Sequence, residues 1–343
     1  TAGEKVEEVR ELELELKDGS PAALYRLAIE LHSTLPLTLG TESKAERGWR
    51  LSTGRPREPK KQKPLTFRSE IGAAEAFRHI IGATLTSLLT NHPAATSGQM
   101  DGVHNMRIAI RRLRAVLMLF RPHLEPNAYD RFAIALRHWG QVLGEARDWD
   151  VFCEQTLRQA TTEDVIGASW IELFRGPAEA ERKAAHQRLA QELAMPGFTA
   201  TVLGLAAWAE EPDLLAGTLD ADAMLGPLAD LVSSLETKLE QKVLHRGRGI
   251  RHRPSQELHD LRKAMKRLRY GVEFMAPLHR RKRVKAYLRH CSALPEALGT
   301  INDAAVAVSL AGRLGGDRQP ELGSAVAAIA GWAELQRAQA MHD

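Results

Sequence analysis

The sequence is poor in cysteine and in aromatic residues, and it contains no long apolar run. Only Cys153 and Cys291 occur among 343 residues, which excludes a disulfide framework, and neither has a metal-ligand spacing. A reducing compartment follows as the simpler interpretation, so we expect the protein in the cytoplasm. No window approaches the ~20 apolar residues of a membrane span, so we expect no membrane association.

Residues 1–10 are polar and acidic and lack the apolar region of a signal peptide. Because the sequence begins at Thr1 and not at a methionine, we expect it to be a piece of a longer protein. With 44% hydrophobic residues, the chain has ample material for a core, which excludes a disordered tail.

What the sequence has instead is charge sorted along the chain. The formal net charge is only +4, but residues 1–50 carry seven basic and ten acidic side chains. Residues 145–235 carry six and sixteen, and residues 240–290 carry sixteen and four. Ordinary solvated helix faces would interleave the two signs within each segment. The separation indicates a locally positive surface for a polyanionic partner.

The first fifty residues differ from the rest. Residues 11–17 alternate between charged and apolar side chains, which predicts a strand with one charged face. A turn at 18–21 and a helix with apolar spacing at 24–31 follow. One strand and one helix do not form a stable domain alone, so residues 1–52 are interpreted as a short α+β tail of a larger domain. Residues 53–68 are interpreted as a basic, proline-containing linker.

From residue 69 onward, the apolar spacing predicts an all-α domain that extends to residue 343. Glycine and proline fall mostly between the apolar runs, as expected for helix ends. The predicted helical runs are 69–91, 101–121, 127–145, 148–160, 178–194, 221–245, 255–278, 281–298, 302–314 and 321–341.

An internal repeat divides this domain. The segment VHNMRIAIRRLR at 103–114 recurs as LHDLRKAMKRLR at 258–269, and LGEARD at 143–148 recurs as LGTIND at 298–303. Both pairs are 155 residues apart. Two motifs that keep one offset indicate a duplication. We therefore expect two similar helical halves, about 69–195 and about 221–341, related by a pseudo-two-fold axis.

Each repeated motif predicts a helix with an apolar back and a cationic front. At about 100° per residue, Met106, Ile110 and Leu113 fall on one side of the first helix, and its histidine and arginines fall on the other. Residues 103–121 hold five arginines and no acid, so these arginines do not form i,i+4 salt bridges within this stretch. Arginine presents a planar fork of N–H donors that matches phosphate oxygens, and histidine adds a further donor.

The motifs resemble those of the CHAD domain (conserved histidine α-helical domain), as do LGEARDWDV at 143–151 and LHDLRKAMKRLRYGVE at 258–273. The resemblance covers about 69–341. It implies a pair of antiparallel four-helix bundles around a basic groove that binds inorganic polyphosphate, in the cytoplasm and in association with polyphosphate granules. The phosphate contacts that it implies are His104, Arg107, Arg111, Arg112, Arg114, His259, Arg262, Lys266, Arg267 and Arg269.

The two halves are not equivalent. Position 266 is Lys where the first half has Arg111, which keeps the charge but loses the bidentate fork. Position 302 is Asn where the first half has Arg147. The sequence therefore leaves open which half binds phosphate more strongly.

A second set of cations has two interpretations: each is either a contact in the same groove or an ordinary solvated side chain. Its members are Arg78, Arg137, Arg147, Lys238, Lys242, Lys285 and Arg289. Asp148 and Asp303 are expected to cap a helix or to orient a nearby arginine. Tyr270 and Glu273 are interpreted as packing and as a structural pair. The run 280–283 is interpreted either as a place that captures a polyanion or as a solvated helix face.

The N-terminal segment resembles the closing part of a CYTH (triphosphate tunnel) domain, in ELELELKDG at 11–19 and SKAERGW at 43–49. The resemblance implies that Glu11, Glu13, Glu15 and Lys17 correspond to residues of a tunnel that holds triphosphate and Mg²⁺ or Mn²⁺. The other strands of such a barrel are absent from this sequence. We therefore expect no catalytic residue, metal or cofactor here, whereas the full-length protein is a candidate inorganic triphosphatase.

Alternatives from two other classes remain open. The same cations would neutralise a nucleic-acid backbone, but only Tyr270 lies near the motifs as an aromatic for base stacking. A phosphohydrolase would need a nucleophile or metal motif, and we find no GxxxxGK[ST], HExxH or GxSxG. The sequence favours a polyphosphate-binding module. Its alternatives are a general polyanion or nucleic-acid binder and an accessory domain that feeds a triphosphatase tunnel; the oligomeric state stays open.

Overall fold

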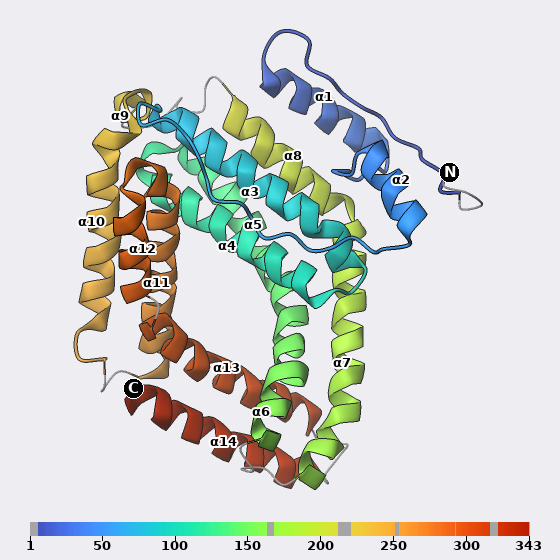
Figure 1. The fold of residues 1–343 in the computed structure, drawn as a ribbon, viewed down its shortest axis with the longest axis vertical. Helices are drawn as coiled ribbons and strands as arrows, with labels where there is room; N and C mark the ends of the chain where they lie inside the picture. Colours follow the sequence, from blue (N-terminus) through green and yellow to red (C-terminus); the bar gives the residue numbers. More distant parts are fainter. Residues whose placement is uncertain are drawn as a thin grey trace. The chain divides into compact units, whose positions relative to one another are not determined.

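The computed structural model describes residues 6–162, 168–211, 221–250, 254–291, 293–315 and 322–342. Within these residues the regular structure is helical, and the predicted all-α class is confirmed. The α-helices are α1 (Pro21–Thr34), α2 (Lys44–Thr53), α3 (Ala73–Thr96), α4 (Met100–Phe120), α5 (Pro126–Val151), α6 (Leu157–Thr162), α7 (Ala168–Ala194), α8 (Pro196–Glu210), α9 (Ala221–Leu225), α10 (Leu228–Gly247), α11 (Ser255–Met275), α12 (Arg281–His290), α13 (Ala293–Leu314) and α14 (Gly323–His342) (Figure 1). Short turns of other types are the 3₁₀ turns η1 (Arg121–His123) and η5 (Ala276–Leu278) and the π-turn η2 (Phe152–Thr156).

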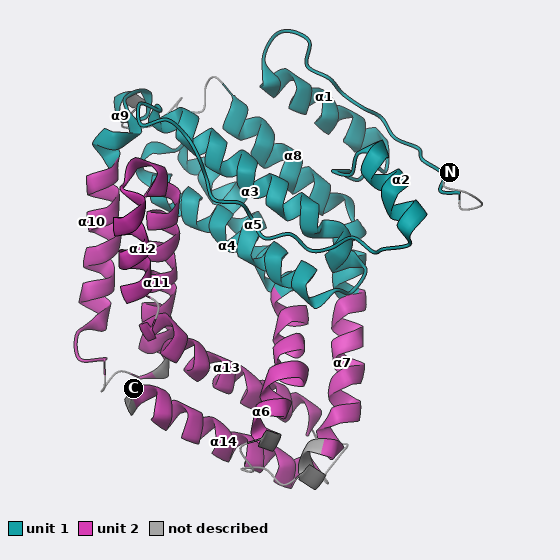
Figure 2. Ribbon diagram, in the orientation of Figure 1, with its two compact units in different colours: residues 1–143, 188–231 teal, residues 144–187, 232–343 magenta. Residues whose placement is uncertain are grey.

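The chain forms two compact units, coloured separately in Figure 2. Unit 1 comprises residues 1–143 and 188–231, and unit 2 comprises residues 144–187 and 232–343. In unit 1, α3 packs against α4 and α8, and α1 packs against α8. In unit 2, α11 packs against α12 and α13, and α13 packs against α14. These unit boundaries differ from the boundaries of the two sequence repeats. The division of the domain into repeats at about 69–195 and 221–341 stays a prediction.

Unit 1 has an aromatic core that includes a helix missing from the predicted runs. The ring of Phe77 lies 5.3 Å from that of Phe120 and 5.8 Å from that of Trp208, which in turn lies 5.1 Å from Phe132. Trp208 belongs to α8, most of whose residues are buried. Because a helix that is apolar all round has no polar face, it shows no amphipathic period in the sequence.

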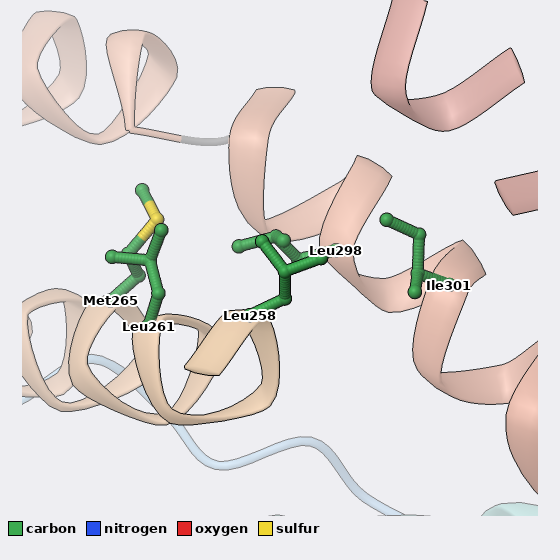
Figure 3. Close-up of a cluster of buried hydrophobic side chains, with 5 residues drawn as sticks. All are labelled: Leu258, Leu261, Met265, Leu298 and Ile301. Carbon is green, nitrogen blue, oxygen red and sulfur yellow. The ribbon is translucent and has the colours of Figure 1, made fainter. Parts of the chain in front are cut away.

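The core of unit 2 includes the back of α11 (Figure 3). Leu258, Leu261 and Met265 of α11 pack with Leu298 and Ile301 of α13, and each is less than 10% exposed. Full burial of such a side chain stabilises the fold by roughly 1.5–3 kcal/mol. This packing sets the rotation of α11 about its axis, and so determines which of its residues face outward.

The helix boundaries repeat with the same offset as the motifs. Helix α4 covers 100–120 and α11 covers 255–275; α3 and α10 begin at 73 and 228, and α7 and α14 begin at 168 and 323. The 3₁₀ turns η1 and η5 also lie 155 residues apart. The duplication in sequence is therefore a duplication of local structure.

One helix of the first half corresponds to two helices in the second. Helix α5 runs without a break from 126 to 151, whereas its counterpart is divided into α12 and α13. Pro295 stands where α5 has Gly140. A proline ring clashes with the carbonyl four residues earlier, but it fits the first turn of a helix, where no N–H partner is required. The predicted run 281–298 is therefore wrong as a single helix.

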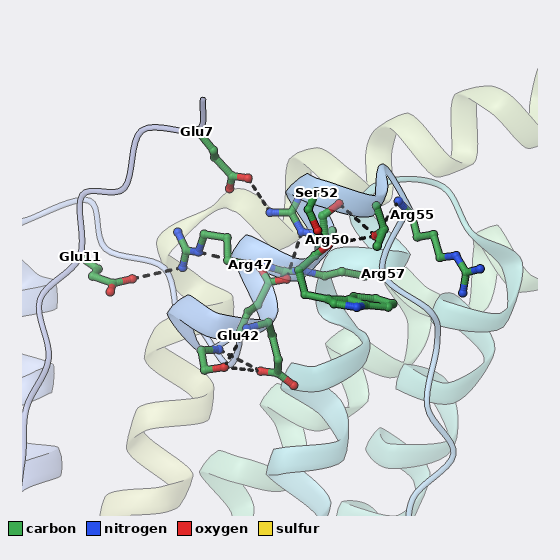
Figure 4. Close-up of polar contacts among 12 residues, drawn as sticks. Glu7, Glu11, Glu42, Arg47, Arg50, Ser52, Arg55 and Arg57 are labelled. Atoms are coloured by element: carbon green, nitrogen blue, oxygen red, sulfur yellow. Dashed lines mark hydrogen bonds and ion pairs between the residues drawn. The ribbon is translucent and has the colours of Figure 1, made fainter. Parts of the chain in front are cut away.

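The predicted strand near the N-terminus is also wrong. Residues 6–17 lie outside regular structure, and the isolated bridge Gly72–Pro227 is the one strand-type pairing in the described chain. Alternating side chains form a strand only when a neighbouring strand accepts the backbone hydrogen bonds. Here the carboxylates bind α2 instead: Glu11 contacts Lys44 at 3.2 Å and Arg47 at 3.1 Å (Figure 4).

Glu42 holds the N-terminal segment to the chain that follows it. Its carboxylate, only 9% exposed, accepts hydrogen bonds from Arg50 at 3.0 Å and from Arg57 (Figure 4). Burial alone would raise the pKa of Glu42, but the hydrogen bonds and positive charges of Arg57 and Arg50 lower it below its usual value. Ser43 and Glu46 then form a capping box at the start of α2.

A buried charged cluster joins the end of α5 to α7 inside unit 2. Asp150 is fully buried, and its Oδ1 accepts hydrogen bonds from Arg182 Nε at 3.0 Å and from His186 Nε2 at 2.8 Å. Arg182 also contacts Glu154 at 3.0 Å. A buried carboxylate is tolerated only when such donors compensate it.

We predict that Arg182→Ala destabilises the protein by about 3–5 kcal/mol, because it removes one of the donors that compensate buried Asp150. Thermal or urea unfolding checks this, with the exposed Lys183→Ala on the same helix as control. Equal stability of the two variants would contradict the prediction.

We predict that Gly102→Ala destabilises the protein by at least about 1 kcal/mol, despite the better helix propensity of alanine. A Cβ at position 102 would lie 2.6 Å from the backbone nitrogen of Ala95, where α3 and α4 approach closely. In the control Gly271→Ala, the Cβ meets the flexible end of Leu239 at 2.5 Å, which can move. Urea unfolding of both variants distinguishes the two cases; a larger loss at 271 would show that the approach of α3 to α4 is not the tighter one.

Candidate functional site

Helix α4 presents the predicted division into an apolar and a cationic side. Met106, Ile110 and Leu113 on its back are at most 1% exposed, and the burial of this face positions the helix in unit 1. The front residues remain accessible to different degrees: His104, Arg107, Arg111 and Arg112 are half-buried, and Arg114 is exposed. A half-buried guanidinium interacts more strongly with an anion than a fully solvated one.

Helix α11 repeats the same division position by position in unit 2. His259, Arg262, Lys266 and Arg267 are half-buried and Arg269 is exposed, as are their counterparts 155 residues earlier. The apolar positions of the two motifs are likewise buried in both helices. The same pattern of burial in two units supports a common role for the two fronts.

In unit 2, α13 positions two of these front residues. His259 Nδ1 lies 2.8 Å from Asn302 Oδ1, and Asn302 Nδ2 donates to Asp303 at 3.2 Å. Asp303 in turn lies 3.8 Å from an Nη of Arg262. Asn302 and Asp303 therefore hold the His259 and Arg262 side chains from the neighbouring helix.

Helix α10 adds cations beside the front of α11. Partial burial and the positive charges of Arg267 and Arg246 lower the pKa of the Lys242 ammonium. Arg246 also donates to the backbone carbonyl of Asp260 at 2.9 Å. Arg246 was missed by the sequence analysis, although it lies in the strongly basic stretch 240–290. Lys242 therefore lies beside two further cations, and the three charges create a positive potential at this place.

The end of α11 carries an intrahelical ion pair. Arg269 Nε donates to Glu273 at 2.9 Å, an i,i+4 pair. Glu273 thus has the structural role expected for it, and Tyr270 is half-buried. The charge of Arg269 is partly balanced within the helix, in contrast to the acid-free first motif.

The second set of candidate cations is distributed over both units. Arg78 in α3 and Arg147 in α5 are half-buried, and the others are exposed. Asp148 and Asp303 lie inside α5 and α13, so their predicted role as helix caps is wrong. For Asp303, the contact with Arg262 agrees with the alternative of orienting an arginine.

Comparison with known proteins decides the family. The CHAD domain model matches residues 79–312, which is most of the chain. The chain belongs to the CHAD domain family. A crystal structure of the CHAD domain from the plant Ricinus communis is similar, with 28% sequence identity and a TM-score of 0.72; the match covers 84% of this chain and 97% of that one. PptA from Streptomyces chartreusis shares the fold at 16% identity and a TM-score of 0.60, over 80% of this chain and all of that one.

The CHAD domain has a cavity of about 490 Å³ beside His259 in unit 2. Its wall is mixed: Leu298 and Val308 contribute apolar surface, and His259, Asn302 and Arg337 contribute polar groups. No group of three or more His, Cys, Asp or Glu suited to a metal is found among the described residues. Likewise, no described helix has both the length and the apolar composition to cross a bilayer.

Both thiols of the CHAD domain are poor nucleophiles. Burial, followed by the charge of Glu179, raises the pKa of Cys153 to about 12. Burial also raises the pKa of Cys291, next to the end of α12. Because the thiolate is the reactive form, raised pKa values make these side chains unreactive near neutral pH.

We predict that Arg267→Gln raises the pKa of Lys242 toward its ordinary value of 10.5, because it removes a neighbouring positive charge. Arg269→Gln on the same helix serves as a control, since Glu273 already balances that side chain. An NMR titration of the Lys242 side chain measures both effects. A pKa that is the same in the Arg267 variant and in the wild type would contradict the assignment of these groups to one cluster.

Proposed function

We propose that this CHAD domain binds inorganic polyphosphate through the cationic fronts of α4 and α11, and that it catalyses no reaction. The observation that carries the proposal is the repetition of one histidine and four cations, with the same burial, on equivalent helices of two units. Packing requires only the apolar back of each helix. The cations of the front are therefore explained by a ligand.

The chemistry of the front residues suits a chain of phosphates. Arginines such as Arg107 and Arg262 offer paired N–H donors, and each charge-assisted hydrogen bond contributes about 1.5–3 kcal/mol. Every phosphate of the chain carries charge, so each further phosphate that reaches a cation adds a contact. Affinity is then expected to rise with chain length and to fall with salt.

The histidines fit the same role. With Asn302 Oδ1 as acceptor, Nδ1 of His259 carries a proton, and Nε2 is the ring atom that would donate to phosphate when the imidazole is protonated. In unit 2, Lys242 and Arg246 add charge beside Arg267. The binding of one polyphosphate molecule by the fronts of both helices stays a prediction from the sequence.

The same surfaces are less suited to nucleic acid. Phe120 and Phe274 at the ends of the two helices are buried, and Tyr270 is half-buried. Neither α4 nor α11 therefore presents an exposed aromatic ring for base stacking. Asn105, which could read a base edge, is buried and donates to Asn91 at 3.2 Å.

We predict that Arg107→Ala combined with Arg262→Ala lowers the affinity for long-chain polyphosphate by about 100-fold, because each change removes a charge-assisted contact. The matched control is Arg68→Ala with Lys183→Ala, which removes the same charge from exposed positions away from the motifs. Isothermal titration calorimetry at one ionic strength compares them, with single-stranded DNA as a second ligand.

The outcomes are distinct. Loss of polyphosphate binding in the motif variant alone supports the proposal. Equal losses in the motif and control variants would show that net charge, and not the motif helices, determines binding. Equal wild-type affinity for DNA and polyphosphate would replace the proposal with a general polyanion surface.

A further inference from the structure

Helix α12 carries an exposed basic surface outside the repeated motifs. Arg280, Arg281, Lys282, Arg283 and Lys285 are all exposed, as is Arg289. The eleven residues 280–290 contain six Lys and Arg and no acid. For the side chains of 280–283 and 285, the described part of the chain provides no ion pair with an acid. This α12 surface is thus a dense patch of positive charge on a short helix.

The first half of the chain provides an internal control for this surface. The equivalent residues 125–135 include Glu125, Asp130 and Arg131, and so have a net charge of −1 against +6 for 280–290. Both segments begin a helix at equivalent positions, 126 and 281. Because the same local structure forms without the cations, the fold does not require them.

The cations also stand where a helix disfavours them. The N-terminus of a helix carries partial positive charge, which is stabilised by acids and destabilised by bases. Glu125 uses this position in α5, where it accepts hydrogen bonds from the backbone N–H of Asn127 and Ala128, and these bonds lower its pKa. Arg280 occupies the same place in α12 and provides no side-chain cap. An external anion explains charges that the helix itself does not favour.

One neighbouring acid and the tyrosine of α12 are already engaged. Glu236 of α10 accepts a hydrogen bond from His279 at 2.9 Å. Burial, together with the charges of Cys291 and Glu240, raises the pKa of Tyr287 to about 12. Tyr287 is thus partly packed against neighbouring groups, and α12 has no exposed Phe, Tyr, Trp, Asn or Gln to stack on bases or read them. The surface fits an anion recognised by charge alone.

We propose that the α12 surface binds the part of a long polyphosphate chain that extends beyond α11. Helix α12 packs against α11 within unit 2, so the two cationic surfaces belong to one compact body. This inference rests on the proposed function of α11. According to this inference, the α12 surface distinguishes long chains from short ones. A short chain contacts only the motif residues of α11 and does not extend to the α12 surface.

We predict that the fourfold variant Arg281→Gln, Lys282→Gln, Arg283→Gln and Lys285→Gln binds long-chain polyphosphate about tenfold more weakly, since four exposed charge contacts are lost. Binding of tripolyphosphate is expected to stay unchanged. The dependence of long-chain affinity on salt is expected to become less steep, because fewer phosphates are neutralised. Calorimetry at several salt concentrations measures all three quantities.

The matched control removes the same charge from scattered exposed positions: Lys63→Gln, Arg68→Gln, Arg131→Gln and Lys183→Gln. Thermal unfolding tests whether both variants are folded. The α12 variant is expected to unfold at the wild-type temperature or above, because its cations oppose the helix dipole. The variant Arg107→Ala with Arg262→Ala is measured beside them, so that the motif helices are tested in the same series.

Weaker binding of the long chain alone, in the α12 variant alone, supports the inference. Unchanged long-chain binding in this variant, with loss in the motif variant, overturns the inference and leaves the proposed function standing. Wild-type binding by the motif variant overturns both. A loss of DNA binding that exceeds the loss of polyphosphate binding would assign the α12 surface to nucleic acid and also overturn the inference.

Discussion

Burial of one apolar stripe on α4 and one on α11 is the constraint on which the functional surfaces depend. The backs of these helices are almost fully inaccessible, and they pack on α3 in unit 1 and on α13 in unit 2. A helix that is held in this way has no freedom to rotate about its axis. Its cations therefore stay together on the outer side, although like charges close together repel one another.

The residues beside the two cationic fronts are only partly the same. In unit 2, Asn302 and Asp303 hold His259 and Arg262, and Glu273 pairs with Arg269. Residues 103–114 of the first motif hold no acid, and Arg147 stands at the position of Asn302, but Asp148 stands at the position of Asp303. The duplicated halves therefore share a cationic pattern and the acid at one neighbouring position, and they differ at the other.

The duplication also separates what the fold requires from what it tolerates. Equivalent helices such as α4 and α11 begin 155 residues apart, so the residues that differ between them do not change where they begin. Pro295 in place of Gly140 breaks one helix into two without removing either part. The charge of residues 280–290 differs from that of residues 125–135 by seven units, which packing does not explain. A difference in charge between equivalent segments therefore indicates a ligand or partner more directly than the charge of one helix alone.

The sequence by itself determined the all-α class, the 155-residue repeat and the division of each motif helix into an apolar and a cationic side. All of these depend on local periodicity, which the chain carries along its length. Tertiary structure decided the rest. The strand expected at 11–17 lacks a partner strand. Helix α8 is apolar over most of its surface and so shows no helical period in the sequence. Asp150 is compensated by Arg182 and His186, which lie more than thirty residues away. Contacts between distant residues leave no periodic trace in a single sequence, and for that reason the cluster of Lys242, Arg246 and Arg267 emerged only from the folded chain.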